Sequence, residues 1–174
     1  NLLTGAYQHV ANYPGVTVEK KVGFFTAKDC KLELVDLPGT YSLTSYSLEE
    51  RVARDFLLSG IPSACVHVLE TDKLKRSLFL TLQLAEMGCP LVLALNMMDK
   101  AEKRGLKIDV KGLSKRLGAR VVPTSARYGR GKEELVGAIT EASADKTRLP
   151  RQVDYGPLEE LIRDLGAGMD LNAP

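Results

Sequence analysis

The chain has 174 residues, with 44% apolar and 26% charged side chains, which is the balance of a globular protein of one ordinary domain. Its 24 Lys and Arg and its 22 Asp and Glu are mixed along the sequence, so nothing indicates a nucleic-acid partner. The longest apolar run, residues 89–95, is too short to span a bilayer, and the three cysteines lack metal-site spacing.

The first part of the chain predicts a hairpin followed by a helix. Residues 1–5 have the pattern of a last helical turn closed by a glycine, and residues 6–17 are expected to be irregular. Residues 17–26 and 31–35 are rich in Val, Phe and Leu and predict two paired strands. A Ser and a Glu with capping-box spacing begin the helix that is expected at 47–58.

The middle of the chain alternates strands with helices. A short apolar strand is expected at 64–69, a helix at 74–87, and a strand at 91–95 whose unbroken apolar run is typical of burial on both faces. Residues 100–108 are expected to form a polar loop. The remaining expected elements are a helix at 110–117, a strand at 120–122 and a helix at 132–140. This alternation predicts an α/β fold with a mostly parallel sheet flanked by helices.

The C-terminal part predicts a change of domain. We expect one domain over residues 1–142 and a polar linker over 143–153. Residues 154–174 are expected to begin a helical domain that the sequence does not complete, with a first helix at 157–165.

A carboxylate and a glycine follow the strand expected at 31–35. In Asp36-Leu37-Pro38-Gly39, the Asp side chain could hold Mg²⁺ through water, and the glycine N–H could approach a phosphate without an intervening side chain. The same four residues also make a good turn, so on their own they do not decide between the two interpretations.

A second polar segment, Asn96-Met97-Met98-Asp99, follows the buried strand at 91–95. A carboxylate here would pair with the two donors at N1 and N2 of guanine and would be left unpaired by adenine. Asn and Asp are also common where strands end. A third segment, Pro123-Thr124-Ser125-Ala126, follows a short strand and offers small residues whose backbone N–H groups could reach a base carbonyl.

The joint pattern is more specific than any one signal. Six candidate residues follow one another along the chain in the order that a GTPase fold requires, and each is expected near a strand end. They are Thr17, Asp36, Gly39, Asn96, Asp99 and Ser125.

These segments and their flanks resemble the cytosolic GTPase domain of the bacterial ferrous iron transporter FeoB. Residues 10–21 resemble the first switch segment of that family and residues 36–44 resemble its second switch. Residues 78–84 and 96–99 are also similar, and the resemblance extends over about residues 1–142. One departure is Tyr13, where the family often has Trp.

The resemblance implies roles for the matched positions. Thr17 and Gly15 would lie in the first switch, with Thr17 contacting Mg²⁺ and the γ-phosphate. Asp36 would hold Mg²⁺ through water, and the Gly39 N–H would meet the γ-phosphate. The residues that would form the guanine pocket are Asn96, Met97, Asp99, Ser125 and Ala126. The Gln that many GTPases carry after Asp-x-x-Gly is absent, which implies slow intrinsic hydrolysis.

The resemblance also implies cofactors and partners. These are GTP or GDP with Mg²⁺, potassium as a candidate activating ion, a transmembrane iron-permease region and self-association, at the cytoplasmic face of the bacterial inner membrane. Two alternatives stay open. One is a GTPase of ribosome assembly or tRNA modification, which would need an RNA-binding appendage. The other is a degenerate, nucleotide-free interaction module.

The family's phosphate loop, Gly-x-x-x-x-Gly-Lys-Ser/Thr, does not occur in the printed sequence. We therefore expect a domain that lacks its first strand and phosphate loop and is truncated at both ends. Losing three or four charge-assisted hydrogen bonds would cost about 5 kcal/mol, or about four decades of nucleotide affinity.

Overall fold

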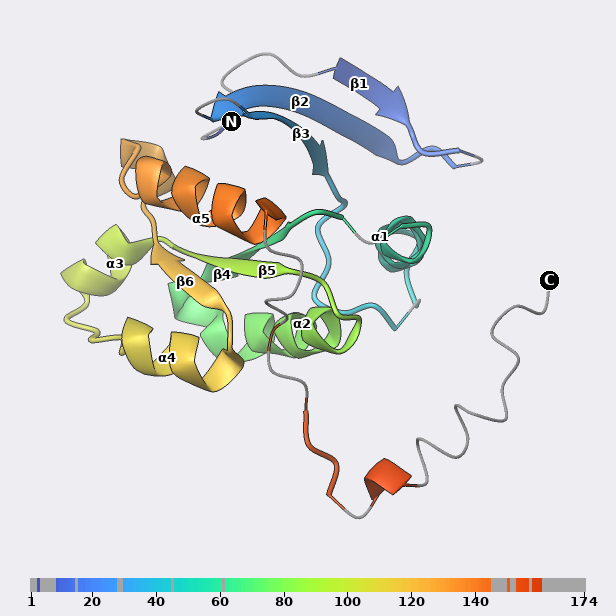
Figure 1. Cartoon of the computed structure of the whole chain (residues 1–174). Helices are drawn as coiled ribbons and strands as arrows, with labels where there is room; N and C mark the ends of the chain where they lie inside the picture. Colours follow the sequence, from blue (N-terminus) through green and yellow to red (C-terminus); the bar gives the residue numbers. More distant parts are fainter. Residues whose placement is uncertain are drawn as a thin grey trace.

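Strands and helices alternate along the computed structural model (Figure 1). The structure describes residues 3, 9–14, 16–27, 30–44, 46–60, 62–144, 150, 153–156 and 158–160. The strands are β1 (His9–Asn12), β2 (Glu19–Ala27), β3 (Cys30–Asp36), β4 (Cys65–Glu70), β5 (Leu91–Asn96) and β6 (Arg120–Pro123). The helices are α1 (Leu48–Leu58), α2 (Leu74–Glu86), α3 (Met98–Lys103), α4 (Val110–Leu117) and α5 (Lys132–Ala144). Two short 3-10 turns are η1 (Thr71–Lys73) and η2 (Ala126–Tyr128).

The strands form two sheets of three. One is antiparallel in the order β1-β2-β3, and the other is parallel in the order β4-β5-β6. Among the described strands, β3 pairs only with β2 and β4 pairs only with β5. Helix α5 contacts both sheets, and Figure 1 shows it lying between them. The two sheets are therefore linked by helix packing and not by a continuous hydrogen-bonded ladder.

The hydrophobic core is centred on β5, whose residues from Leu91 to Leu95 are all buried. Because side chains alternate along a strand, Leu93 and Leu95 pack into one cluster, together with residues of α1 and α2. Val92 and Ala94 pack into a second cluster with α5. This two-sided burial explains the unbroken apolar run, since helices cover both faces of the parallel sheet.

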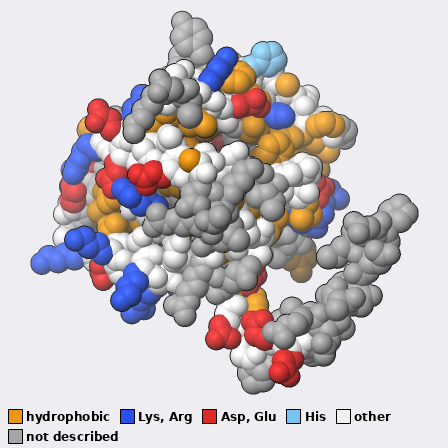
Figure 2. All heavy atoms as spheres, in the orientation of Figure 1, with side chains coloured by type: hydrophobic (Ala, Val, Ile, Leu, Met, Phe, Trp, Pro, Cys, Tyr) orange, Lys and Arg blue, Asp and Glu red, His pale blue; other side chains and the backbone are white. Residues whose placement is uncertain are grey.

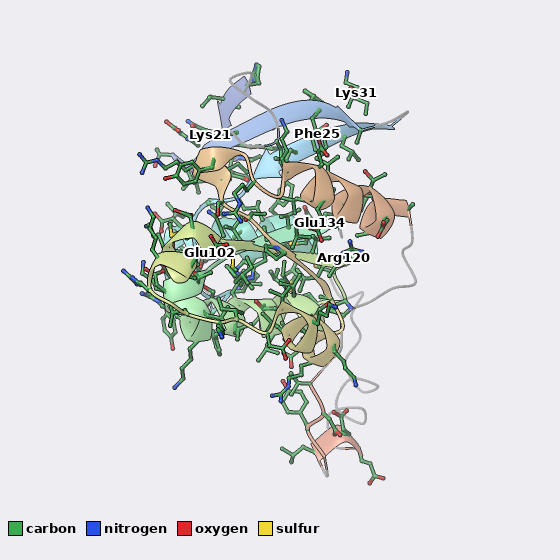
Figure 3. All side chains as sticks on the ribbon, turned by 90° about the vertical axis from the view of Figure 1, so that its left-hand side faces the viewer. Lys21, Phe25, Lys31, Glu102, Arg120 and Glu134 are labelled. Atoms are coloured by element: carbon green, nitrogen blue, oxygen red, sulfur yellow. The ribbon has the colours of Figure 1, made fainter. Side chains whose placement is uncertain are left out.

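The antiparallel sheet joins this core through its hairpin. Phe25 of β2 and Leu32 of β3 pack against the cluster that surrounds α5. Figure 3 shows Phe25 between the hairpin and the helix, whereas Lys31 points away into solvent. The figure also shows Arg120 of β6 beside Glu134 of α5, and the two charged groups are 3.6 Å apart.

The predicted α/β fold, with a parallel sheet flanked by helices, is confirmed. The expected irregular segment 6–17 is wrong in part, because residues 9–12 form β1. All four of its residues are exposed, so it has no alternating hydrophobic pattern to reveal it. The polar loop expected at 100–108 is also wrong in part, because α3 occupies 98–103 with Ala101 as its buried residue.

Smaller differences lie at the ends of elements. Helix α5 continues to Ala144 and so passes the end expected at 140. The helical turn expected at 1–5 lies outside the described residues except for Leu3, and so does much of the linker at 143–153. Of the helix expected at 157–165, residues 158–160 are described and are helical.

Lys and Arg side chains project from the left-hand edge of the molecule, over α3 and α4 (Figure 2). Both helices carry basic residues in their last turns, where positive charge is favoured by the helix dipole. Among the described helices, none combines the length and the apolar character that a bilayer crossing requires.

Candidate functional site

The loops that follow β5 and β6 are tied together by Asn96. Its side-chain oxygen accepts hydrogen bonds from the Ala126 N–H, at 3.1 Å, and from the Thr124 hydroxyl, at 3.4 Å. The Thr124 N–H also donates to the carbonyl of Leu95, at 2.8 Å, which continues the pairing of the two parallel strands beyond β6. A single amide side chain at the end of β5 therefore sets the position of the next loop.

Met97 makes a sharp turn between β5 and α3. Its backbone is left-handed, with φ 65°, and it is the one described residue other than glycine with a positive φ. Such a conformation costs about 1 kcal/mol or more, so surrounding contacts must hold it. The Thr71 hydroxyl donates to the Met97 carbonyl at 3.2 Å, and the N–H groups of Lys100 and Ala101 donate to the same oxygen. The turn places Asp99 in the first turn of α3.

Asp99 is held by its backbone, and the residue is half-buried. Its N–H donates to the Ser125 hydroxyl at 3.1 Å, and Ser125 is only 1% exposed. The Ser125 N–H donates in turn to the Arg130 carbonyl at 3.2 Å. The half-buried Asp99 carboxylate lies close enough to Arg130 to add to the rise in the guanidinium's pKa, which is caused mainly by the hydrogen bonds with Glu102. Its two oxygens are acceptors that could meet two neighbouring donors of a ligand.

The loop after β6 closes at a glycine where any side chain would be strained. Gly131 has φ +80°, and a Cβ atom built there would lie 2.3 Å from the Pro123 carbonyl oxygen. Just before it, the Arg130 guanidinium makes two hydrogen bonds to Glu102 of α3, at 3.1 and 3.2 Å. These contacts connect the loop after β6 to α3, in addition to the hydrogen bonds of Asn96.

A second group of candidate residues lies at one end of the antiparallel sheet. Asp36 ends β3 opposite Lys21 of β2, and Thr17 lies in the turn between β1 and β2. Asp36, Thr17 and Gly39 are all exposed. Gly15, the remaining candidate of this group, lies outside the described residues.

The segment after Gly39 is held by several side chains although it has no regular structure. The Glu50 carboxylate accepts hydrogen bonds from the Ser42 hydroxyl (2.7 Å), the Thr44 hydroxyl (3.2 Å) and the Tyr46 N–H (3.0 Å). These bonds lower the pKa of Glu50, the Ser42 hydroxyl contributing most. Ser47 caps α1 by accepting from the Glu50 N–H at 3.1 Å, as its spacing predicts.

Helix α2 supplies a further support to this segment. The Leu43 N–H donates to the Gln83 side-chain oxygen at 3.0 Å, and Leu43 is buried in the core. The Arg76 guanidinium lies over the ring of Tyr41, 3.6 Å from its centroid. The segment is therefore fixed to both α1 and α2.

The structure brings together the candidates Asn96, Met97, Asp99, Ser125 and Ala126. Within the described residues, no hydrogen bond or ion pair joins this group to Thr17, Asp36 or Gly39. The residues of this region that were not predicted from the sequence are Thr71, Glu102, Arg130 and Gly131. Gly131 carried a local signal, because glycine is typical of tight turns, and the others carried none.

The parallel sheet is flanked by helices, and an Asn-x-x-Asp turn and a small-residue loop are joined at its strand ends. This is the arrangement of a domain with the GTPase fold. Comparisons with known proteins narrow this class. The family model described as "Ferrous iron transport protein B" matches residues 1–139. The chain belongs to this FeoB family.

Individual relatives agree with the family model. The chain is 50% identical over 171 residues to the Fe(2+) transporter FeoB of Salmonella choleraesuis (strain SC-B67), which is 95% of this chain and 22% of that protein. It spans about a fifth of the length of the curated relatives it matches.

Two solved structures of the cytosolic domain of the T. maritima FeoB iron transporter are also similar. The GDP form II has a TM-score of 0.91 and 43% identity, and it covers 100% of this chain and 69% of that one. The GMPPNP form has a TM-score of 0.91 and 42% identity, with the same two coverages.

Proposed function

We propose that the chain is the guanine-nucleotide-binding, GTP-hydrolysing regulatory domain of a ferrous iron membrane transporter. The observation that carries this proposal is the bridge from Asn96 to Ala126 and Thr124, with Asp99 in the first turn of the helix that follows. The family assignment supports it, and so do the GDP and GMPPNP forms of the T. maritima structures.

Guanine selectivity would come from Asp99. Its two carboxylate oxygens form a pair of acceptors that matches the N1–H and N2–H₂ donors of guanine, and adenine has no such pair. Ser125 and Asn96 hold this residue and the opposing loop before any ligand arrives. The hydrogen bond from the Ala126 N–H to Asn96 holds the loop after β6 in place. The pocket for the base would therefore need little rearrangement when the nucleotide binds.

The phosphate end would depend on Thr17, Asp36 and Gly39. Mg²⁺ prefers oxygen ligands, and an exposed carboxylate and an exposed hydroxyl at the same end of one sheet suit it. When bound, Mg²⁺ neutralises charge on the phosphate oxygens. Asp36 and Thr17 would hold the ion, and Gly15 would let the backbone of the first switch approach the nucleotide.

The hydrolytic step would be slow without a partner. The Gly39 N–H would orient the terminal phosphate for attack by water. Thr40 takes the place after Gly39, and its hydroxyl already donates to the Ser42 carbonyl at 2.6 Å and accepts from the Ser42 N–H at 3.2 Å. A side chain so engaged is poorly placed to orient a water molecule, which suits a regulatory switch better than a metabolic enzyme.

The partners follow from the same proposal. We expect the domain to act on the transmembrane iron-permease region of a transporter, at the cytoplasmic face of the bacterial inner membrane. The family resemblance also leads us to propose that the domain self-associates and that potassium activates it.

The test is a titration of fluorescent GDP into two proteins in Mg²⁺ buffer. One is the chain as printed, and the other carries at its N-terminus a segment with the phosphate loop that the resemblance implies, Gly-x-x-x-x-Gly-Lys-Ser/Thr. We expect the extended protein to bind GDP at micromolar concentration or tighter and to ignore ADP, with the printed chain weaker by about four decades. A well-folded extended protein that binds no guanine nucleotide would overturn the proposal and favour a nucleotide-free interaction module.

A further inference from the structure

Tyr13 is buried in a part of the molecule that is otherwise exposed. It lies in the turn between β1 and β2, where its N–H donates to the Val18 carbonyl at 2.9 Å. Its side chain is only 6% exposed, although Asn12 and Pro14 on either side are exposed. Burying one large aromatic side chain in such a turn requires specific partners elsewhere in the fold.

The partners of Tyr13 come from two other segments. Its hydroxyl donates to the backbone carbonyl of Asp36, at 3.2 Å. Its ring meets the ring of Phe56 in α1 edge to face, with centroids 6.1 Å apart and an interplanar angle of 80°. The Lys20 ammonium lies 5.9 Å from the first ring centroid and 5.6 Å from the second, so one cation is attracted to both.

These contacts join the three segments on which the proposed phosphate chemistry depends. Tyr13 belongs to the first switch, Asp36 begins the second, and Phe56 lies in the helix that follows it. A cavity of about 600 Å³ lies between the turn and α1, with Tyr13, Lys20 and Phe56 among its walls. Both rings therefore lie at the border between the turn and α1.

We propose that Tyr13 is a positioning residue for Mg²⁺-dependent GTP hydrolysis, acting through its hydroxyl on Asp36 and through its ring on α1. This inference rests on the proposed function. A hydrogen bond to the Asp36 carbonyl fixes the peptide plane from which both the Asp36 carboxylate and the following Leu37-Pro38-Gly39 segment depart. The ring contact makes the position of that plane depend on the position of α1.

The protonation state of Tyr13 suits this role. Burial, and secondarily the negative charge of Asp36, raise the pKa of the Tyr13 phenol above its usual value. The hydroxyl therefore stays protonated at neutral pH and can donate to the Asp36 carbonyl.

The test separates the hydroxyl from the ring. Tyr13→Phe removes the hydroxyl and keeps the ring, Phe56→Leu removes the aromatic partner and keeps the hydroxyl, and Tyr46→Phe is the matched control. Tyr46 is 94% exposed, so removing its hydroxyl disturbs no packing. Each variant is made in the N-terminally extended protein and in the chain as printed.

Three quantities are measured in the extended protein: GDP affinity in EDTA, the Mg²⁺ concentration that gives half-maximal retention of GDP, and the Mg²⁺ dependence of hydrolysis. Tyr13→Phe removes one neutral hydrogen bond that would hold Asp36 in place. We therefore expect the Mg²⁺ concentrations for half-maximal GDP retention and for half-maximal hydrolysis to rise about threefold to tenfold. GDP affinity in EDTA should stay unchanged, which a general loss of folding would not allow. Tyr46→Phe should change none of the three.

Hydrogen exchange in the printed chain supplies a readout that needs no nucleotide. Tyr13→Phe should speed exchange of the amides that follow Asp36, and Phe56→Leu should speed exchange in the first switch turn. If the extended protein with Tyr13 unchanged binds no GDP, the proposed function fails. The hydrogen-exchange result then decides by itself whether Tyr13 holds the first switch turn, the segment after Asp36 and α1 together. If it binds GDP and Tyr13→Phe leaves the Mg²⁺ midpoints within twofold, the positioning role is overturned.

Discussion

The proposed base-reading end of the molecule (the base end) and its proposed phosphate-contacting end (the phosphate end) are built differently. At the base end, Asn96, Ser125 and the Arg130–Glu102 pair connect the loops after β5 and β6. Asn96 and Ser125, which make these connections, lie directly at the ends of the buried parallel strands. At the phosphate end, Thr17, Asp36 and Gly39 are exposed and lie on segments held mainly by side chains of other elements.

This difference matches the separate tasks of a molecular switch. The base of a guanine nucleotide is the same before and after hydrolysis, so a pocket that is formed in advance loses nothing by being rigid. The γ-phosphate is present in only one state, so the segments that sense it must have two positions of similar free energy. Side-chain hydrogen bonds of modest strength allow such a change, whereas a buried sheet does not.

The largest expected effect tests whether the base end reads guanine. In the extended protein, Asp99→Asn should weaken GDP binding by at least about a hundredfold, because an amide presents one donor where guanine needs an acceptor. The same change should improve binding of xanthosine diphosphate, whose O2 atom accepts that donor. Fluorescent competition titration measures both. The control is Asp72→Asn, which removes only a 4.0 Å pair with Arg104; equal losses in the two variants would refute the assignment.

The next effect tests whether the base-end loop is rigid. Gly131→Ala should lower the free energy of unfolding by about 2 kcal/mol or more, since the new Cβ would meet the Pro123 carbonyl and φ is positive. Gly137→Ala is the matched control, because nothing lies within 4 Å of a Cβ atom at this position in α5. That change should stabilise by about 0.5–1 kcal/mol. Urea denaturation measures both, and a tolerated Gly131→Ala would mean that the loop can rearrange.

A pH dependence should appear in the sheet that carries the base end. His67 of β4 is hydrogen-bonded to the Thr81 hydroxyl at 3.0 Å, and burial lowers its pKa to about 4. Because the unfolded state binds the proton more tightly, His67 contributes stability above pH 6.5 that is lost as pH falls toward 4. Between pH 7.5 and 5 this loss is about 2 kcal/mol.

His67→Gln should remove that part of the pH dependence, and the same change at the exposed His9 should not. Unfolding free energies from urea denaturation at several pH values give the comparison. If both variants retain the slope of the unmodified chain, titrating carboxylates account for it and His67 does not.

The sequence predicts the parallel-sheet half of the molecule better than the hairpin half. Helix α4 occupies the expected residues 110–117 because both of its ends carry local signals. Asp109 caps it by accepting from the Gly112 N–H at 2.8 Å, and Gly118 ends it in a left-handed conformation. Strand β1 had no such signal, since its four exposed residues are ordered only by pairing with β2.

The candidate site divides in the same way. Asn96, Asp99 and Ser125 could be found because their residue types and order along the chain carry the chemistry. The contacts that position them could not, because Arg130 meets Glu102 across 28 residues of sequence and no local pattern encodes that distance. Tyr13 could be seen as a departure from a family pattern, but its contact with Asp36 depends on how the hairpin folds back.

The smallest expected effect tests whether the phosphate end is held by side chains. Glu50 collects three hydrogen bonds from the segment after Gly39, and Glu50→Gln weakens each by replacing a charged acceptor with a neutral one. Amides of residues 42–46 should then exchange roughly threefold to tenfold faster, while those of β5 stay as they were. Glu49→Gln is the matched control, because Glu49 is exposed and lies in the same first turn of α1. Unchanged exchange in Glu50→Gln would show that Leu43 and Gln83 hold the segment by themselves, and the contrast between a rigid base end and a switchable phosphate end would then be weaker than proposed.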